Sequence, residues 1–549
     1  MMWFATGLGI VAGAAELVVI ERVLPEYPEE DAEIECMVTL RVTPEGVPSA
    51  AAVEGCDEPH AAAAEEAALQ WRFQPFELDG GEPEAVFQTP MFDLAPLRTV
   101  PPEVVPPSPL QLPEPEIYTL RPGVEVWHVR VPSVRKVAVH VVMREGLVEL
   151  VGMPNQAARA TGWMVDVAAG EYSAPELSLI EDLHEIELWS RIGLHDGSVS
   201  LVVPREDLEL GLQLQRTVLR EPTFPKKDLK RYLRDQQLFY TVNAPSSQAR
   251  VAGYALAHAW FPADHPYGAR PNLAELKGIK PRTLSDLYEL WLSSVPLTLV
   301  VVGDLPFEEI RAPLEAMVED LGVDRPPASA LEVPLPPPRV LAVDMPGQSQ
   351  VAIRLRTPAP PRGHEDSVAM RAIQWVLGGH FLSRLNRVLR EERGYTYGSG
   401  ASYRSGPTWG SLTFSVDVGS ENLAETVTVI QEQIDAILEA GVEAEELESA
   451  RRSFVQDWNT TRQTASQAAR LYLAALEEGV SIETKRDRRE AMGSLAAEDV
   501  IRVAQEWMGP DAPRVWVFVG DRAKMEPELA ELGLEAEWID PNRAVLGNF

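Results

Sequence analysis

The stretch VPLTLVVVGDLPFEEIRAPLEAM at residues 295–317 has a counterpart near the C-terminus, APRVWVFVGDRAKMEPELAEL at residues 512–532. Each stretch is an apolar run that ends in Val-Gly-Asp and passes into a segment whose apolar residues have helical spacing. The two aspartates, Asp304 and Asp521, lie 217 positions apart. A repeat at this distance predicts that one large supersecondary unit occurs twice in the chain.

A second pair of segments keeps nearly the same offset. VAVHVVMREG (137–146) pairs with VAIRLRTPAP (351–360), 214 positions later, so the two copies share the order of their elements. In the first copy, residue patterns predict strands at 124–131, 137–143 and 297–303, and helices at 173–192, 207–219 and 226–242. Each copy is therefore expected to be a sheet with helices on one face, which makes the fold class α+β, built twice.

Proline-rich segments mark the domain boundaries. LAPLRTVPPEVVPPSPLQLPEPEIY (94–118) and RPPASALEVPLPPPRV (325–340) have the composition of stiff, extended linkers. We therefore expect a small domain at 16–95, a linker at 96–117, a large module at 118–324, a second linker at 325–339 and a second large module at 340–541.

The N-terminus and the cysteines bear on the compartment. Residues 1–15, MMWFATGLGIVAGAA, form an apolar run that ends in a small-residue cleavage pattern, typical of a signal peptide although no positive residue precedes it. A buried first strand is the alternative. Cys36 and Cys56 could pair across neighbouring strands in an exported protein, or remain core thiols in a cytosolic one. We expect a periplasmic or otherwise exported protein of a Gram-negative-type envelope. The net charge of −34 argues against nucleic acid as a partner.

One run in the second copy carries a family resemblance. AIQWVLGGHFLSRLNRVLREERGYTYGSGASY (372–403) combines an apolar helix, Gly-Gly, Ser-Arg-Leu, Leu-Arg-Glu and Gly-x-x-Tyr-Gly. It resembles the second domain of the pitrilysin/insulinase-type metallopeptidases, the inverzincins. The resemblance extends over residues 118–541 and includes HPYG (265–268) and both Val-Gly-Asp strand ends.

The resemblance implies roles for residues in this run. Arg390 and Tyr397 would lie opposite the zinc and hydrogen-bond the substrate carbonyl, where two fixed donors can stabilise an oxyanion. Gly394, Tyr395 and Gly398 would lie beside the substrate, and Gly394 would let the chain turn out of the helix into a strand that carries Tyr397. The alternative is that Arg390 only pairs with a carboxylate and Tyr397 only packs.

The zinc half of such a site is missing from the first copy. The family carries His-x-x-Glu-His there, in which two histidines bind zinc and the glutamate activates the metal-bound water. In GMPNQAARATGWMV (152–165) these three positions hold Asn155, Ala158 and Arg159, and the downstream glutamate ligand falls near Asp235 or Gln236. We therefore expect no zinc in this chain.

The chain resembles the non-zinc subunits of two-chain members of the family. The resemblance implies a zinc-bearing pitrilysin-like partner, a heterodimer, and an extended peptide or unfolded protein as the substrate, which adds as a strand to a sheet edge. The chain alone would be inactive, since the residues at the zinc motif cannot bind metal. The alternative is a non-catalytic peptide-binding scaffold or docking protein of the cell envelope.

The N-terminal region has a resemblance of its own. LPEYPEEDAEIECMVTLRVTPEGVPSAAAVEG (24–55) and AALQWRFQPFELDGG (67–81) resemble the C-terminal domain of TonB energy transducers. The shared features are Pro-x-Tyr-Pro, a strand with Pro-x-Gly, and an alanine-rich helix that runs into Trp-Arg-Phe-x-Pro. This implies a module that docks on an envelope protein, and the alternative is a small cap without a partner.

Overall fold

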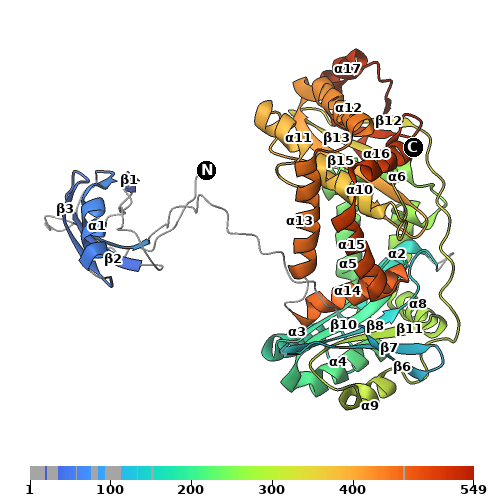
Figure 1. Cartoon of the computed structure of the whole chain (residues 1–549). Coiled ribbons are helices and arrows are strands. Elements are labelled where there is room, and N and C mark those ends of the chain that lie inside the picture. The colour runs from blue at the N-terminus through green and yellow to red at the C-terminus, as the bar shows by residue number, and fades with distance from the viewer. Residues whose placement is uncertain are drawn as a thin grey trace. The chain divides into compact units, whose positions relative to one another are not determined.

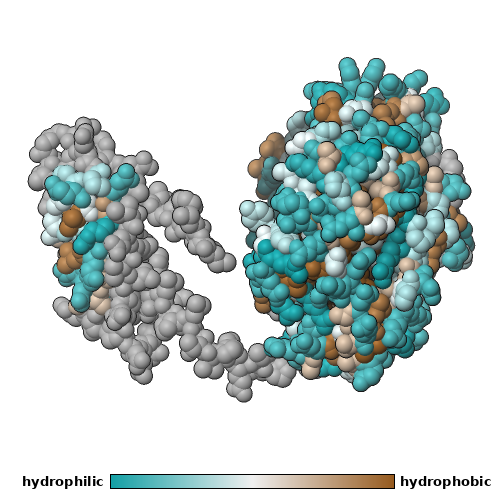
Figure 2. Space-filling view, turned by 90° about the horizontal axis from the view of Figure 1, so that it is seen from above, coloured by the Kyte–Doolittle hydropathy of each residue, from teal (hydrophilic) through white to brown (hydrophobic). Residues whose placement is uncertain are grey.

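The computed structural model describes residues 19–21, 35–56, 58–75, 85–92, 113–132, 134–149, 154–460 and 464–549. The predicted signal peptide at 1–15 lies outside them. The chain separates into two units, residues 1–108 and 109–549, and each is described by itself. The face of the molecule in Figure 2 is largely hydrophilic and carries separate apolar patches.

The N-terminal unit is a small sheet with one helix. Strand β2 (Glu35–Val42) lies between β3 (Pro48–Glu54) and β5 (Ala85–Phe92), and both pairs are antiparallel. Helix α1 (Glu58–Leu69) packs on this sheet, and a short strand β4 (Arg72–Phe73) pairs with β1 (Val19–Glu21). Leu40, Trp71 and Phe73 form its core. This is a small αβ domain, as the sequence predicts.

A disulfide joins Cys36 in β2 to Cys56, which follows β3. The two Cα atoms are 5.3 Å apart, because β2 and β3 are neighbours in the sheet. Cys36 is fully buried beside the core residues of this unit. The bond therefore joins the central strand to the segment that leads into α1.

Removing this bond should destabilise the N-terminal unit. The two cysteines are 20 residues apart, and closing a loop of this size stabilises a fold by about 3 kcal/mol in the chain-entropy model. The Cys36→Ala/Cys56→Ala variant should therefore unfold this unit at a lower denaturant concentration, with the transition of residues 109–549 unchanged. Urea titration followed by hydrogen exchange separates the two units. An unchanged midpoint in the N-terminal unit would contradict the expected stabilisation.

The larger unit contains two six-stranded sheets that share the arrangement of five strands and differ in one edge strand (Figure 1). The first has the order β6-β7-β11-β8-β10-β9 and the second has the order β14-β15-β13-β16-β12-β17. In each, a central strand is antiparallel to two neighbours, and one of these runs parallel to the next strand. The prediction of an α+β fold built twice is confirmed.

The strands of the first sheet are β6 (Glu116–Arg121), β7 (Val124–Arg130), β8 (Lys136–Met143), β9 (Glu187–Ile192), β10 (Gly197–Pro204) and β11 (Leu297–Gly303). Those of the second are β12 (Arg339–Asp344), β13 (Gln350–Pro358), β14 (Ser399–Ser405), β15 (Gly410–Gly419), β16 (Val515–Gly520) and β17 (Glu537–Ile539). The repeated Val-Gly-Asp motif ends β11 and β16. Asp521 caps helix α17 (Arg522–Glu531) through the Ala523 N–H, and Asp304 bonds to Arg130.

The helices of the first module are α2 (Asn155–Met164), α3 (Ala174–His184), α4 (Leu208–Arg220), α5 (Lys226–Leu238), α6 (Gln248–Trp260), α7 (Leu273–Gly278), α8 (Pro281–Ser294) and α9 (Phe307–Met317). The second module has α10 (Ser367–Gln374), α11 (Arg384–Asn386), α12 (Leu423–Ala440), α13 (Ala444–Thr460), α14 (Ala465–Glu478), α15 (Ile482–Ser494), α16 (Ala497–Met508), α17 and α18 (Pro541–Leu546).

Three predicted boundaries are wrong. The helix predicted over 173–192 ends at His184, because Glu185 takes a left-handed conformation and the chain continues into β9. Strand β6 begins at Glu116, inside the predicted linker 96–117. The second module continues beyond residue 541, since α18 packs against α6.

The two modules exchange one helix each. Helix α6 of the first module packs on β12, β13 and β16 of the second sheet, where Ala252 and Ala255 share a core with Val517 and Val519. Helix α14 of the second module packs on β8 and β11 of the first sheet. In Figure 1, α6 lies among the second-module elements and α14 beside β10 and β8. Both faces of each sheet are thus covered, and one of them carries a helix of the other module.

Candidate functional site

The predicted oxyanion residues follow a broken helix in the second module. This helix ends at Glu392, and Gly394 has a φ of +70°, the left-handed conformation that glycine adopts readily. Tyr395, Tyr397 and Gly398 lie in the loop that connects it to β14. The strand begins only at Ser399, so the expectation that Tyr397 lies in a strand is wrong.

Arg390 and Tyr397 have few contacts in this chain. The Arg390 guanidinium carbon lies 3.5 Å from the centre of the Phe381 ring, and its nearest ion pair, with Glu391, is 4.0 Å long. One buried Arg390 nitrogen, Nη1, has no hydrogen-bond partner among the described residues. Tyr397 exposes 97% of its surface. Both side chains therefore keep hydrogen-bonding capacity that another molecule could use.

Tyr395 differs from Tyr397 in its surroundings. Its hydroxyl donates to the Glu425 carboxylate, which also pairs with Arg393. Its ring packs against the hydrophobic core of the second module. The Gly398 N–H donates to the Thr396 hydroxyl at 3.2 Å, which closes a tight turn under Tyr397. Tyr395 anchors the loop, whereas Tyr397 projects from it.

Two amide side chains cover the adjoining edge of β14. The Asn386 oxygen accepts from the Ser399 N–H at 2.7 Å, and its nitrogen donates to the Ser399 carbonyl at 2.9 Å. The Gln374 nitrogen donates to the Ala401 carbonyl at 2.8 Å. The sequence analysis missed both residues, because an asparagine and a glutamine within helical segments carry no distinctive spacing.

The corresponding edge in the first module is covered by carboxylates. Asp166 accepts from the Ser190 N–H of β9 at 2.9 Å, and Glu181 accepts from the Leu188 N–H. Burial, together with the neighbouring Asp166 charge, raises the pKa of Glu181 to about 7. A peptide that adds as a strand to β9 or to the start of β14 must displace these side chains.

The degenerate zinc motif forms one face of α2. The Arg159 Nε donates to the Asn155 side chain at 2.6 Å, Ala158 is buried, and Asp235 pairs with Arg234 at 3.0 Å. Within the described residues no three histidine, cysteine, aspartate or glutamate side chains are grouped to hold a metal. A cationic guanidinium and a neutral amide do not fit a zinc ion, so no hydrolytic step can be derived for this chain alone.

We predict that the purified chain holds no stoichiometric zinc at α2 after dialysis and cleaves no peptide by itself. The physical reason is that Arg159 repels a dication and Ala158 cannot accept a proton. Elemental analysis and a general peptide library provide the measurement. One tightly held zinc per chain that disappears in Asp235→Ala would contradict this prediction.

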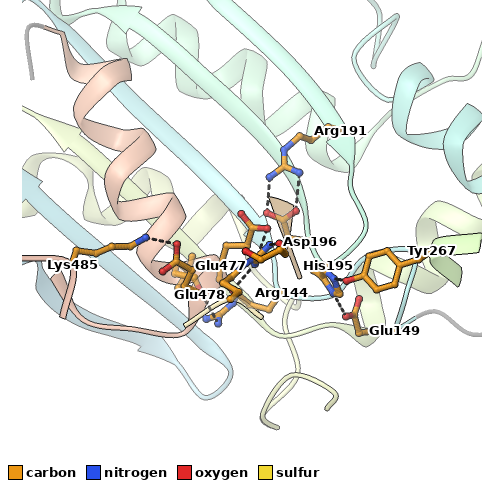
Figure 3. Close-up of polar contacts among 12 residues, drawn as sticks. Arg144, Glu149, Arg191, His195, Asp196, Tyr267, Glu477, Glu478 and Lys485 are labelled. Atoms are coloured by element: carbon orange, nitrogen blue, oxygen red, sulfur yellow. Dashed lines mark hydrogen bonds and ion pairs between the residues drawn. The ribbon is translucent and has the colours of Figure 1, made fainter. Parts of the chain in front are cut away.

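His195, Glu149 and Tyr267 form a buried polar cluster (Figure 3). The His195 Nδ1 hydrogen-bonds to the Glu149 carboxylate at 2.6 Å, and its Nε2 forms a short hydrogen bond with the Tyr267 hydroxyl. The Tyr267 ring stacks edge to face with Trp409 of the second module at 5.3 Å. Burial raises the pKa of Tyr267 to about 12, so this phenol stays neutral. The cluster joins the two modules.

Comparisons with known proteins agree with this fold. Residues 279–454 match the family described as peptidase M16 inactive domain. The mitochondrial presequence protease of Yarrowia lipolytica is 27% identical over 180 residues, which are 33% of this chain and 17% of that protein. The chain thus matches only a small part of that relative's length.

Two solved structures have the same fold. The peptidase M16 inactive domain from Pseudomonas fluorescens superimposes with a TM-score of 0.67 at 18% identity, over 74% of this chain and 98% of that one. The periplasmic protease PqqL from Escherichia coli gives 0.63 at 15% identity, over 77% of this chain and 49% of that one. The predicted resemblance of the two large modules to the pitrilysin/insulinase-type peptidases is confirmed: they have the M16 peptidase fold, and residues 279–454 match the inactive-domain family. The resemblance of the N-terminal unit to a TonB C-terminal domain stays a prediction.

Proposed function

We propose that this chain is the non-zinc subunit of a metalloprotease heterodimer and that it supplies Arg390 and Tyr397 to a zinc-bearing M16-type partner. The observation that carries this proposal is the asymmetry between the two half-sites. The zinc helix has lost its ligands and its base, whereas Arg390 and Tyr397 remain and have few contacts of their own. Such a donor pair can act in hydrolysis when another chain brings the metal.

Exposed apolar side chains around both half-sites support a protein partner. Phe381 and Leu382 beside Arg390 expose 59% and 69% of their surface, and Trp163 on α2 exposes 43%. Large apolar side chains that cluster at a surface commonly mark protein interaction sites. A partner that covers these residues would also exclude water from the shared site.

The proposed compartment is the periplasm or another exported location. The Cys36–Cys56 disulfide is typical of oxidising compartments, and the structural relative from Escherichia coli is a periplasmic protease. No helix among the described residues is long and apolar enough to cross a membrane. The N-terminal unit would then serve as the module that docks on an envelope protein.

Reconstitution with a partner tests the heterodimer. A short M16 protein that carries His-x-x-Glu-His and comes from the same genome is purified, loaded with zinc and mixed with this chain. We expect an equimolar complex that cleaves an unstructured peptide, while each chain alone is inactive. A partner that is fully active alone and gains nothing from this chain would contradict the proposal.

The second candidate is a non-catalytic peptide-binding scaffold. The covered edges of β9 and β14 argue against catalysis by strand addition, since side chains already occupy the backbone groups that a substrate strand would use. A scaffold would instead hold peptides elsewhere on its surface. A scaffold would bind extended peptides without a partner and would show no Arg390-dependent turnover in any complex. Binding and turnover, measured separately, therefore distinguish the two functions.

A further inference from the structure

A cavity of about 620 Å³ lies between the first sheet and the exchanged helix α14. Its sheet side is formed by alternate residues of β8, β9 and β10, including His140, Trp189 and Ser200, and its helix side includes Arg470 and Leu473. Figure 3 shows Arg191, Asp196 and Glu477 of this region. On the other half of this sheet face, α14 packs against apolar residues of the sheet and forms a buried hydrophobic core. The cavity lies where α14 and the sheet are no longer in close contact.

Each carboxylate that lines this cavity already has a basic partner. Arg191 donates to both oxygens of Asp196, at 2.7 and 2.6 Å. Glu477 pairs with Arg362 at 3.0 Å and Glu187 with Lys136 at 3.3 Å. Arg470 has no ion-pair or hydrogen-bond partner within the described part of the chain. Arg470, at the exposed side of the cavity, is therefore a lining guanidinium whose charge is not paired with a carboxylate of the described residues.

The floor of the cavity holds a buried histidine with a free nitrogen. His140 is 4% exposed, and its Nε2 has no hydrogen-bond partner among the described residues. Burial and the nearby Arg191 lower the pKa of His140 to about 4, so the ring is neutral. The hydroxyls of Ser198 and Ser200, which bond to each other at 3.2 Å, lie on the same floor. A buried polar atom without a partner costs free energy that a bound ligand can recover.

We propose that this cavity binds one carboxylate of an extended polypeptide, through an ion pair with Arg470 and hydrogen bonds from the floor. One uncommitted guanidinium matches a monoanion, and the three nearby carboxylates oppose a more highly charged group. Trp189 and Leu473 supply apolar surface for the stem of an acidic side chain. The choice of a polypeptide as the carrier rests on the proposed function. The site itself is separate from Arg390 and Tyr397.

Three acetylated pentapeptides test this site on the full chain alone, by saturation-transfer NMR and calorimetry. The first has a central glutamate and an amidated C-terminus, the second has glutamine in its place, and the third is all alanine with a free C-terminal carboxylate. We expect the glutamate peptide to bind about tenfold or more tightly than the glutamine peptide. Preference for the free C-terminus instead would identify the terminal carboxylate as the ligand, with the same chemistry.

Arg470→Gln should remove this preference, because it deletes the ion pair at an exposed position where folding is not at risk. Arg216→Gln is the matched control, since Arg216 is an exposed arginine on α4, which packs against the opposite face of the same sheet. Equal binding of the glutamate and glutamine peptides, no binding at low-millimolar concentration, or full binding by Arg470→Gln would each overturn the inference. Partner-dependent cleavage is measured separately, so failure of the cavity and failure of the heterodimer give different results.

Discussion

Arg390→Ala and Tyr397→Phe should each lower the turnover of the reconstituted heterodimer on the order of 100- to 1,000-fold. The reason is that each substitution removes one preorganised donor to the developing oxyanion, a loss that costs about 2.7–4 kcal/mol of transition-state stabilisation. The complex itself should still form, because Tyr397 is almost fully exposed and neither side chain supports the core. Cleavage rate and complex mass, measured on the same samples, provide the test.

Two nearby residues serve as controls. Arg387→Ala removes an arginine one turn earlier that is 58% exposed and forms an ion pair with Glu392, at 3.7 Å. Tyr395→Phe removes the hydroxyl that bonds to Glu425, which affects the loop anchor without removing a donor from the substrate side. Both variants should retain most of the turnover. If Arg390→Ala and Tyr397→Phe cleave at the wild-type rate, the shared-site mechanism is wrong and the scaffold function replaces it.

Ala469→Glu should destabilise both modules together, by about 3–5 kcal/mol. Ala469 of α14 is fully buried against the first sheet, so the substitution places an uncompensated charge in a dry interface. Because α14 belongs to the second module and α6 covers the second sheet in return, loss of one contact should weaken the other. Urea unfolding followed by hydrogen exchange in β8 and β13 reports on the two sheets separately.

Ala491→Glu is the matched control, since Ala491 lies on the exposed side of the next helix, α15. It should shift the unfolding midpoint very little. A result in which Ala469→Glu increases exchange in β8 and leaves β13 protected would show that the modules fold independently and would contradict this prediction.

Much of the fold could be predicted from the sequence, because strand patterns and the repeated Val-Gly-Asp ends are local signals. The exchange of α6 and α14 could not, since helical periodicity does not specify which sheet a helix covers. One signal was available: β11 reads Leu-Thr-Leu-Val-Val-Val-Gly, and all of it is buried. A continuous apolar run indicates cover on both faces of a sheet, in contrast to the alternation of a half-exposed strand.

The error at residues 173–192 has a similar cause. Apolar residues continue at helical spacing through the end of α3, and a left-handed Glu185, without a glycine, hides the break before β9. At the candidate site, the spacing of Arg390 and Tyr397 could be read from the sequence. The role of Glu425 could not, because it is 30 residues from Tyr395 in the chain and meets it only after folding.

The exchanged helices also determine whether the proline-rich segment at 325–339 allows the two modules to bend relative to each other. Arg325 donates to the Glu145 carboxylate at 2.9 Å, the Ala328 N–H donates to the same group at 2.7 Å, and the Leu331 carbonyl accepts from Thr408 at 2.6 Å. Bending between the modules would have to uncover α6 and α14 at the same time as it broke these bonds. The segment therefore fastens the two modules together and does not act as a flexible hinge between them. If the proposed heterodimer forms, we expect any opening that admits a substrate to occur between the two chains, because bending within this chain would break these contacts.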